Sequence, residues 1–285
     1  MKNTIKEVDE SVNLPKVSLL GQFFTLMIGL LVVIGAVYFA LGWAVNVVVD
    51  HLSHETYAKL QQRVSQHEFL PVAKKMQQLQ DLLDELVALS PNPDLKLKFR
   101  VLCEPQFNAV ALPDGSVVFF EKLLRSIHSE NELAMVMGHE IGHYISRDHM
   151  KVMGRGILLV LFSMLFQMED VDWVGPSTSM YHAKYSQHQE TLADEMGANL
   201  VHKKYGHISG IESFFRTMET IDMDEHGHKH PGKFVSWFST HPHPQDRWKH
   251  LKQQWKKTEG EGKETFLDLS EIDLLCPPKA SSQAH

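Results

Sequence analysis

The sequence predicts a mainly helical α+β fold with a small β-sheet, preceded by one transmembrane helix. Three observations support this prediction. An uncharged apolar run fills 17–49, apolar residues recur at helical spacing over 55–90 and after 129, and alternating β-branched and aromatic residues lie in 95–124. The net charge of −7, with no basic stripe, argues against a nucleic-acid partner.

The apolar run from Val17 to Val49 contains no Asp, Glu, Lys or Arg. About 20 apolar residues cross the hydrocarbon core of a bilayer, so the run predicts one membrane anchor that is long enough to tilt. A cleaved signal peptide would have a shorter apolar region, of about 7–15 residues; a buried helix of a soluble protein is the third interpretation. Three lysines precede the run, against Lys59 and Arg63 soon after it, which favours a cytoplasmic N-terminus.

We expect five segments along the chain. A polar tail, 1–16, precedes the anchor, 17–49, and a helical membrane-proximal region, 50–94, leads into the main domain, 95–258. A second polar tail, 259–285, ends the chain. The membrane-proximal helix is predicted from apolar residues at three- and four-residue steps, and "SPNPD" ends it.

Within the main domain, "LKFRVLCEPQFNAVALPDGSVVFFEKLL" predicts short strands with a turn at 113–115. The next helix begins after "SENE". Ser129 is its expected N-cap, and Glu132, three residues later, predicts a capping box. This helix carries the motif that is most informative about function.

Other segments of the main domain are less specific. The apolar run 155–167 is too short to cross a bilayer, and predicts either a buried helix or a segment that dips into the membrane surface. A further helix is expected over 186–204, ended by Gly206. Cys103 and Cys276 are too few for a disulfide scaffold, and the sequence leaves open whether they pair.

The motif is "HEIGH", in which His139 and His143 are four residues apart. On a helix they share one face, so both imidazoles can bind one zinc ion. Glu140 lies about a quarter turn away and can take the proton of a water that zinc has acidified. The five-residue pattern also occurs by chance. However, Gly138 and Gly142 destabilise a helix by about 1 kcal/mol each, which indicates that another backbone packs closely here.

A catalytic zinc site has a third protein ligand, and "SQHQETLADEMGANLV" contains the best candidate. Glu190 and Asp194 again share one helical face. Glu190 could bind the metal, while Asp194 could accept a hydrogen bond from a ligand histidine, with His139 as the first choice. A solvated acidic face on a surface helix is the alternative. Small residues beside the pair, including Gly197, favour close packing against another helix.

These residues match a known family. "NELAMVMGHEIGHYISRDH" followed by "ETLADEMGA" closely resembles the zinc metallopeptidases of family forty-eight, a gluzincin group that includes HtpX, the CAAX prenyl endoprotease and BepA. The resemblance covers roughly 95–251, including "FNAVALPDGSVVFFEKLL" and "STHPHPQDRWKHL". It implies a zincin-like metalloprotease domain with one Zn²⁺ per chain. The implied metal ligands are His139, His143 and Glu190, with Glu140 as the catalytic base and Asp194 supporting a ligand.

The resemblance also places His241 and Arg247 near the site, as a fourth metal ligand or a transition-state stabiliser. In some relatives this histidine caps the open position of the metal, and here the neighbouring His243 is an alternative. The family binds its polypeptide substrate in extended form along a sheet edge, which corresponds to the strands near 108–118. Edge binding suits an unfolded substrate.

A single membrane span distinguishes this chain from relatives with several spans. We therefore expect a membrane-anchored endopeptidase that hydrolyses unfolded or damaged proteins in quality control. Its expected location is a bacterial inner membrane, with the catalytic domain on the periplasmic side. The alternative is an inactive or self-inhibited relative that acts as a chaperone or assembly factor.

Other histidines support a further alternative, a metal-storage or structural zinc protein. "HGHKHP", residues 226–231, could bind metal or form a solvated loop. His149 lies six residues after His143, turned away from the two ligands, which favours a structural role.

Overall fold

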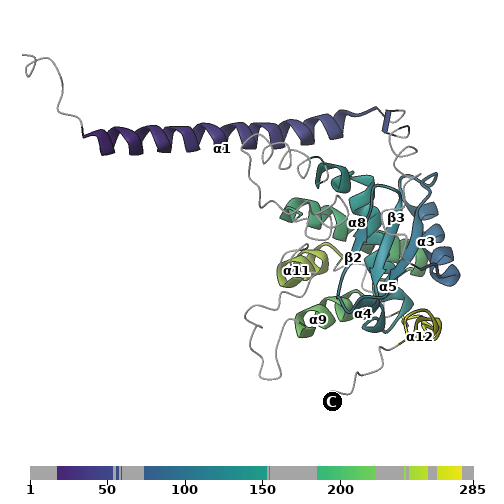
Figure 1. Ribbon diagram of the computed structural model, residues 1–285. Helices are drawn as coiled ribbons and strands as arrows, with labels where there is room; N and C mark the ends of the chain where they lie inside the picture. Colours follow the sequence, from purple (N-terminus) through teal and green to yellow (C-terminus); the bar gives the residue numbers. More distant parts are fainter. Residues whose placement is uncertain are drawn as a thin grey trace, which may run out of the picture.

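The computed structural model describes residues 18–53, 56, 57, 59, 74–152, 154, 185–221, 241, 244–255 and 262–277. In these residues a long N-terminal helix extends from a helical domain that contains a three-stranded sheet (Figure 1). The predicted α+β fold, mainly helical with one apolar helix at its start, is confirmed. The apolar run 155–167 and the tract 226–231 lie outside the described residues.

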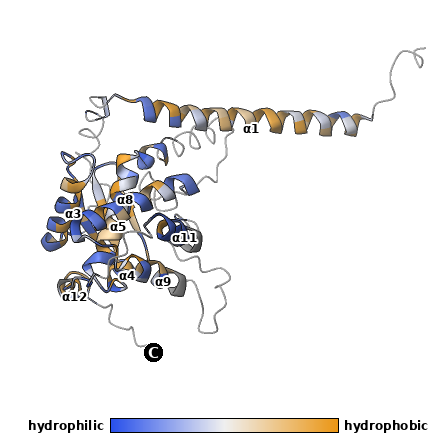
Figure 2. Ribbon diagram, turned by 180° about the vertical axis from the view of Figure 1, so that it is seen from behind, coloured by the Kyte–Doolittle hydropathy of each residue, from blue (hydrophilic) through white to orange (hydrophobic). Residues whose placement is uncertain are grey.

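The first helix, α1 (Leu19–His51), has 33 residues and leaves its large apolar side chains exposed. Figure 2 shows hydrophobic residues along most of its length. Among the described helices it alone is long and apolar enough to cross a membrane. Its N-terminal end lies apart from the domain, whereas its C-terminal end lies beside the domain, where Val49 is buried (Figure 1).

Most residues of the domain that lie in regular secondary structure are in helices. They are α3 (Gln77–Leu89), α4 (Glu121–Arg125), α5 (Glu130–Ile145), α8 (Gln187–Tyr205), α9 (Ile211–Ile221), α11 (Pro244–Trp255) and α12 (Glu271–Leu275). The predicted start of the central helix α5 is half right. Ser129 accepts a hydrogen bond from the Glu132 N–H (3.2 Å) and is the N-cap. The Glu132 carboxylate, however, accepts from the His128 N–H and not from the Ser129 N–H, so the capping box is incomplete.

The sheet consists of β1 (Lys98–Leu102), β2 (Ala109–Ala111) and β3 (Ser116–Phe120), in the order β1-β3-β2. The central strand β3 runs parallel to β1 and antiparallel to β2. As predicted, the chain turns between β2 and β3, where Gly115 has a φ of 84° and the Asp114 carboxylate accepts the Ser116 N–H. In the described residues β2 therefore forms one edge of the sheet, next to α5.

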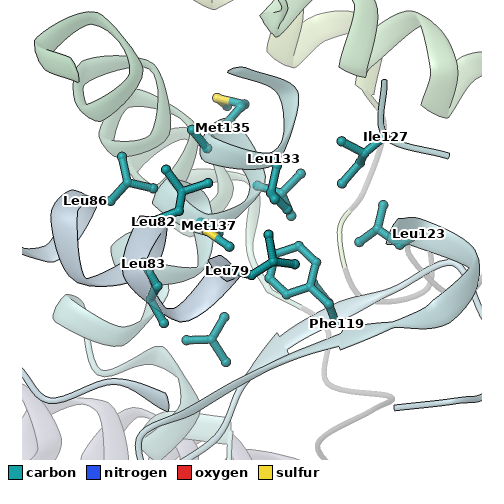
Figure 3. Close-up of a cluster of buried hydrophobic side chains, with 14 of the residues drawn as sticks. Leu79, Leu82, Leu83, Leu86, Phe119, Leu123, Ile127, Leu133, Met135 and Met137 are labelled. Atoms are coloured by element: carbon teal, nitrogen blue, oxygen red, sulfur yellow. The ribbon is translucent and has the colours of Figure 1, made fainter. Parts of the chain in front are cut away.

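A hydrophobic core holds α3 and the sheet against α5 (Figure 3). Leucines at three- and four-residue steps on α3 point into this core, among them Leu79 and Leu83, which are 1% and 0% exposed. They meet Leu133 of α5 and Phe119 of β3. Complete burial of one such side chain contributes roughly 1.5–3 kcal/mol. This packing fixes α5 in place, and α5 carries the HEIGH motif, residues 139–143.

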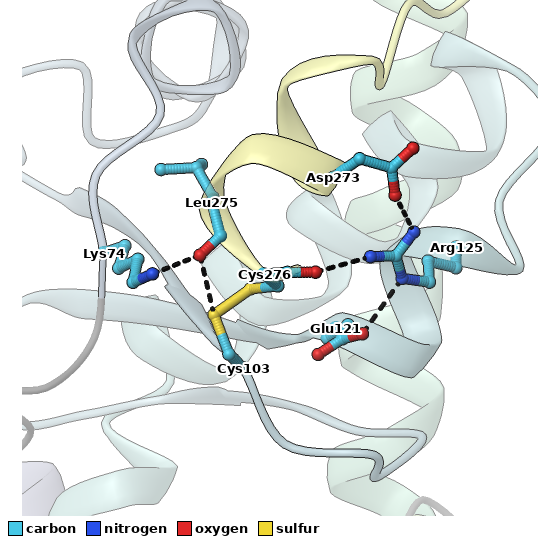
Figure 4. Close-up of a disulfide and its surroundings, with 7 residues drawn as sticks. All are labelled: Lys74, Cys103, Glu121, Arg125, Asp273, Leu275 and Cys276. Atoms are coloured by element: carbon cyan, nitrogen blue, oxygen red, sulfur yellow. Dashed lines mark hydrogen bonds and ion pairs between the residues drawn. A yellow bond between two sulfur atoms is a disulfide. The ribbon is translucent and has the colours of Figure 1, made fainter. Parts of the chain in front are cut away.

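A disulfide between Cys103 and Cys276 joins the end of β1 to α12, with Cα atoms 5.3 Å apart (Figure 4). Arg125 strengthens this junction, because it donates to the Cys276 carbonyl (2.8 Å) and forms an ion pair with Asp273. Residues 262–277 of the polar C-terminal segment thus lie against the domain. The bond closes a long loop, since its two cysteines are separated by 173 residues.

Candidate metal centre

The helices α5 and α8 pack at unusually short distance because glycines face each other across the contact. A Cβ atom added at Gly138 would lie 2.8 Å from the Gly197 Cα, and one added at Gly142 would lie 2.9 Å from the Ala193 Cα. Real Cβ atoms do not approach a backbone so closely. This is the close packing that the two glycines of the motif predicted, and it brings the polar side chains of the two helices within reach of each other.

Four buried side chains converge where α5 and α8 meet: those of His139, His143, Glu190 and His241, whose ligand atoms lie within 4.8 Å of one another. His139 Nε2 and His143 Nε2 are 3.0 Å apart. Glu190 Oε1 is 3.4 Å from His143 Nε2, and Glu190 Oε2 is 3.8 Å from His139 Nε2. The structure therefore brings together the three ligands expected from two segments that are distant in the sequence.

Two carboxylates orient the two imidazoles. His139 Nδ1 lies 2.9 Å from Asp194 Oδ1, and His143 Nδ1 lies 3.0 Å from Asp148 Oδ2. An ionised carboxylate only accepts hydrogen bonds, so each Nδ1 carries the proton. The lone pairs of the two Nε2 atoms then face each other at 3.0 Å, an arrangement that requires a positive charge between them.

The donor set fits zinc. Two histidine nitrogens at about 2.0–2.1 Å from one tetrahedral zinc ion would lie roughly 3.3 Å apart, close to the observed separation. Zinc also accepts a carboxylate oxygen as its third protein ligand. Glu190 is fully buried, and its carboxylate charge suits a divalent cation shared with the two histidines.

The charges around the site also favour a bound cation. Burial would lower the pKa of His143, but its contacts with Asp148 and Glu190 raise that pKa to about 10. Burial would raise the pKa of Glu190, but His241 and Arg247 hold it well below its usual range. Glu190 thus stays ionised and favours a cation beside His143.

Glu140 lies beside the four converging side chains and is fully buried. Burial raises the pKa of its carboxyl group. Neither carboxylate oxygen has a hydrogen-bond partner, and His241 Nε2 lies 4.0 Å from Glu140 Oε1. Two free acceptor oxygens in a buried polar site are suited to binding a water molecule.

His241 and Arg247 both lie at the site, as the resemblance implied. His241 Nδ1 is 2.8 Å from Glu190 Oε1 and 3.2 Å from His139 Nε2. Arg247 donates from Nε and Nη2 to the two oxygens of Asp194, both at 2.6 Å, and its Nη1 is 2.8 Å from Glu190 Oε2. His243 lies outside the described residues.

Two residues of the site were not expected from the sequence. Asp148 follows His143 by five residues, but the helix ends between them, so helical spacing could not connect the pair. Tyr185 stacks on the His143 ring, with centroids 3.9 Å apart and planes at 17°. It precedes the cap of α8, and no local pattern marks it. His149 is buried and stacks on Tyr144, in line with the structural role expected for it.

Comparisons with known proteins agree with this geometry. The family model described as Peptidase family M48 matches residues 73–255. The chain is 29% identical over 167 residues to the Bos taurus protein named metalloendopeptidase OMA1, mitochondrial, covering 53% of this chain and 31% of that protein. It is 24% identical over 178 residues to mitochondrial metalloendopeptidase OMA1 of Schizosaccharomyces pombe, covering 61% and 51%. With metalloprotease YcaL of Escherichia coli it is 25% identical over 166 residues, covering 55% and 62%.

The chain thus spans about a third to somewhat under two thirds of these relatives. The match to the family nevertheless includes the helices α5, α8 and α11 that build the site. Its relatives' names describe metalloproteases, and its buried histidine and carboxylate cluster can hold a metal. The chain belongs to peptidase family M48, a family of metallopeptidases.

Proposed function

We propose that this chain is a membrane-anchored, zinc-dependent endopeptidase that hydrolyses peptide bonds in unfolded or damaged proteins, as a quality-control enzyme. One observation carries the proposal. His139, His143 and Glu190 converge in a buried site, and Glu140 beside them keeps both carboxylate oxygens unpaired. The names of the relatives, metalloendopeptidase OMA1 and metalloprotease YcaL, support the same chemistry.

His139, His143 and Glu190 would hold the zinc ion. When bound, zinc lowers the pKa of a coordinated water toward about 7 and polarises a carbonyl oxygen. Glu140 acts as the general base, and its raised pKa brings it closer to the pH at which proton transfer is efficient. It takes a proton from the attacking water and passes that proton to the leaving amine, with no covalent intermediate. Asp194 and Asp148 hold both imidazoles in the tautomer that leaves Nε2 free.

We propose that the substrate adds to the sheet as an extended strand along β2. The pairs of residues 108 with 120 and 112 with 116 are hydrogen-bonded across β2 and β3. By the alternation of an antiparallel ladder, the N–H and C=O groups of Ala109 and Ala111 point to the outer edge. The strand β2 also packs against α5, the helix that carries Glu140. A peptide on this edge would present its backbone beside the proposed base.

We further propose that α1 anchors the chain in a bacterial inner membrane with the catalytic domain on the periplasmic side. The exposed apolar surface of α1 supports the anchor. The Cys103–Cys276 disulfide supports the extracytoplasmic side, because such bonds persist in oxidising compartments and are rare in the cytosol.

A specific contact favours a second candidate, a self-inhibited relative. His241 contacts both Glu190 and His139, so its imidazole could take the position on the metal that a water needs. In that state the chain would bind metal but would not cleave until His241 moves. A chaperone or assembly role would then not depend on Glu140.

The test is digestion of an unfolded protein by the full-length chain in detergent, with and without a chelator. Glu140→Gln should reduce the cleavage rate by about 10²–10⁴-fold while zinc stays bound at one ion per chain. Glu212→Gln, on the exposed face of α9, is the matched control. Cleavage that persists at the wild-type rate in Glu140→Gln, or that ignores the chelator, would exclude the proposal. A higher rate in His241→Ala than in the wild type would identify the self-inhibited state.

A further inference from the structure

The C-terminal end of α1 is bonded to the segment that follows the metal-binding helix, residues 146–151. Arg147 Nη1 donates to the carbonyl oxygens of Val49 and Leu52, both at 2.9 Å. The Arg147 guanidinium also lies over the Tyr57 ring, 4.5 Å from its centroid. Carbonyl groups at a helix C-terminus lack partners inside the helix and favour a cation, so Arg147 is suited to hold the end of α1.

Lys151 makes a second connection from the same segment. Its Nζ is 2.8 Å from Asp50 Oδ1 at the end of α1 and 3.4 Å from Asp148 Oδ1. The other oxygen of Asp148, Oδ2, accepts the hydrogen bond of the metal-binding His143. One lysine thus lies between the end of α1 and the carboxylate that orients His143.

Asp148 is held from two directions. Gln189 of α8 donates to its Oδ1 at 2.6 Å, and Lys151 approaches the same oxygen. Asp148 is 1% exposed, so a carboxylate at this place needs these partners. The Gln189 contact comes from α8 within the domain, whereas Lys151 also contacts the end of α1.

The backbone of the 146–151 segment is strained at Arg147. Its φ is 57°, and among the described residues it is the one non-glycine with positive φ. A glycine would adopt this left-handed conformation freely, while a residue with a Cβ atom disfavours it. The contacts of the Arg147 side chain with α1 offset this strain. The conformation that places Asp148 under His143 therefore depends in part on α1.

We propose that the C-terminal end of α1 positions the metal-binding histidine His143, with Arg147 and Lys151 as the positioning residues. This inference rests on the proposed zinc site. On this proposal, α1 supports the geometry of the metal centre in addition to anchoring the chain in the membrane. When α1 leaves the domain, Arg147 and Lys151 lose their partners, Asp148 loosens, and the chain holds zinc less tightly.

The test is a zinc titration of the full-length, metal-free chain in detergent micelles, in competition with a chromogenic chelator. Direct hydrogen-bond partners of metal ligands change metal affinity by about 10–100-fold, so residues one contact further away should change it less. We expect Arg147→Gly and Lys151→Met each to weaken zinc binding by roughly three- to tenfold. Arg147→Gly also removes the backbone strain, so it separates the lost contact from a strained fold. Lys252→Met, an exposed lysine on α11, should leave the affinity unchanged.

The most specific variant lies on α1 itself. Asp50→Asn changes a half-exposed residue outside the domain, and should weaken zinc binding in the same direction as Lys151→Met. The effects of the two substitutions on zinc affinity should not add in the double variant, because both remove the same ion pair, Asp50 with Lys151. Lys151→Arg, which keeps the cation, should retain the wild-type affinity.

Wild-type zinc affinity in Asp50→Asn, Lys151→Met and Arg147→Gly would overturn the proposal, even if the melting temperature falls, because the contacts would then be merely structural. Zinc affinity is measured without substrate. A chain that shows these changes but cleaves no protein would refute the proposed function while leaving the role of α1 intact.

Discussion

On each of two sides of the metal centre, a carboxylate orients one histidine, but the surroundings of the two carboxylates differ. On the α8 side, Asp194 orients His139 and is itself clamped by Arg247. On the side of the 146–151 segment, Asp148 orients His143 and is approached by Lys151. The two histidine contacts are nearly equal, at 2.9 and 3.0 Å. The supports differ, because the α8 side is enclosed by the domain whereas Lys151 also pairs with Asp50, whose side chain is 52% exposed.

This difference indicates where the centre is rigid and where it can be adjusted. Arg247 binds Asp194 through two hydrogen bonds and approaches Glu190, so all of its partners are buried. Paired buried charges depend strongly on each other, since a missing partner leaves an uncompensated charge. The 146–151 side depends instead on a contact with a separate helix that reaches solvent. We expect substitutions on the α8 side to cause large losses of stability. Substitutions on the side of the 146–151 segment should cause smaller losses that depend on the contact with α1.

The largest expected effect is that of Arg247→Met. It leaves the Asp194 and Glu190 carboxylates buried without their cation, so the free energy of unfolding should fall by about 3–5 kcal/mol. Lys151→Met should lower it by about 1 kcal/mol or less, because its pair with Asp50 is partly solvated. Denaturant unfolding of the full-length chain measures both. Arg216→Met, on an exposed ion pair of α9, is the control. Equal losses in Arg247→Met and Lys151→Met would remove the distinction between the two sides.

A second effect concerns the metal. Asp194→Asn and Asp148→Asn should each weaken zinc binding by about 10–100-fold, because an amide supports the imidazole less well than a carboxylate does. The two sides should differ when Lys151→Met is added. Its effect should be lost in the Asp148→Asn background and retained in the Asp194→Asn background. Chelator competition measures the zinc affinities of the wild type, the three single variants and the two double variants. Additivity in both backgrounds would show that Lys151 does not act through Asp148.

The same two sides differ in how far the sequence predicted them. His139 and His143, like Glu190 and Asp194, are four residues apart on one helix, so spacing alone indicated a shared face. Asp148 follows a helix end at which Arg147 adopts a left-handed conformation without being glycine. No local pattern signals that conformation. The support of His143 was therefore missed, while the support of His139 was proposed.

Elsewhere, local signals were reliable and long-range pairing was not. The turn at 113–115 and the end of α8 at Gly206 were predicted from residue types, and the structure contains both. The strand order β1-β3-β2 and the Cys103–Cys276 bond depend on contacts between distant segments, which one sequence does not reveal. The predicted capping box of α5 failed in its second half, because the Glu132 carboxylate accepts from the His128 N–H.

The smallest expected effect is a response to mild acid that begins on the 146–151 side. Burial lowers the pKa of His149 to about 3, and this residue lies within the segment. Its pKa in the unfolded chain is about 6.5, so below that pH the unfolded state gains a proton that the folded state does not accept. The free energy of unfolding should therefore fall as the pH drops below about 6.5, by roughly 1 kcal/mol near pH 6.

The ion pair between Asp194 and Arg247 on the α8 side should not respond in this range. Burial alone would raise the pKa of Asp194, but Arg247 lowers it below its usual value, so its contribution to stability is lost only in stronger acid. Amide hydrogen exchange between pH 7 and 5.5, with zinc bound, should accelerate in 144–152 before it does in 190–200. His149→Phe keeps a ring against Tyr144 and removes the titration, so it should flatten the pH dependence of stability. An unchanged pH dependence in His149→Phe would show that acid does not act through this histidine.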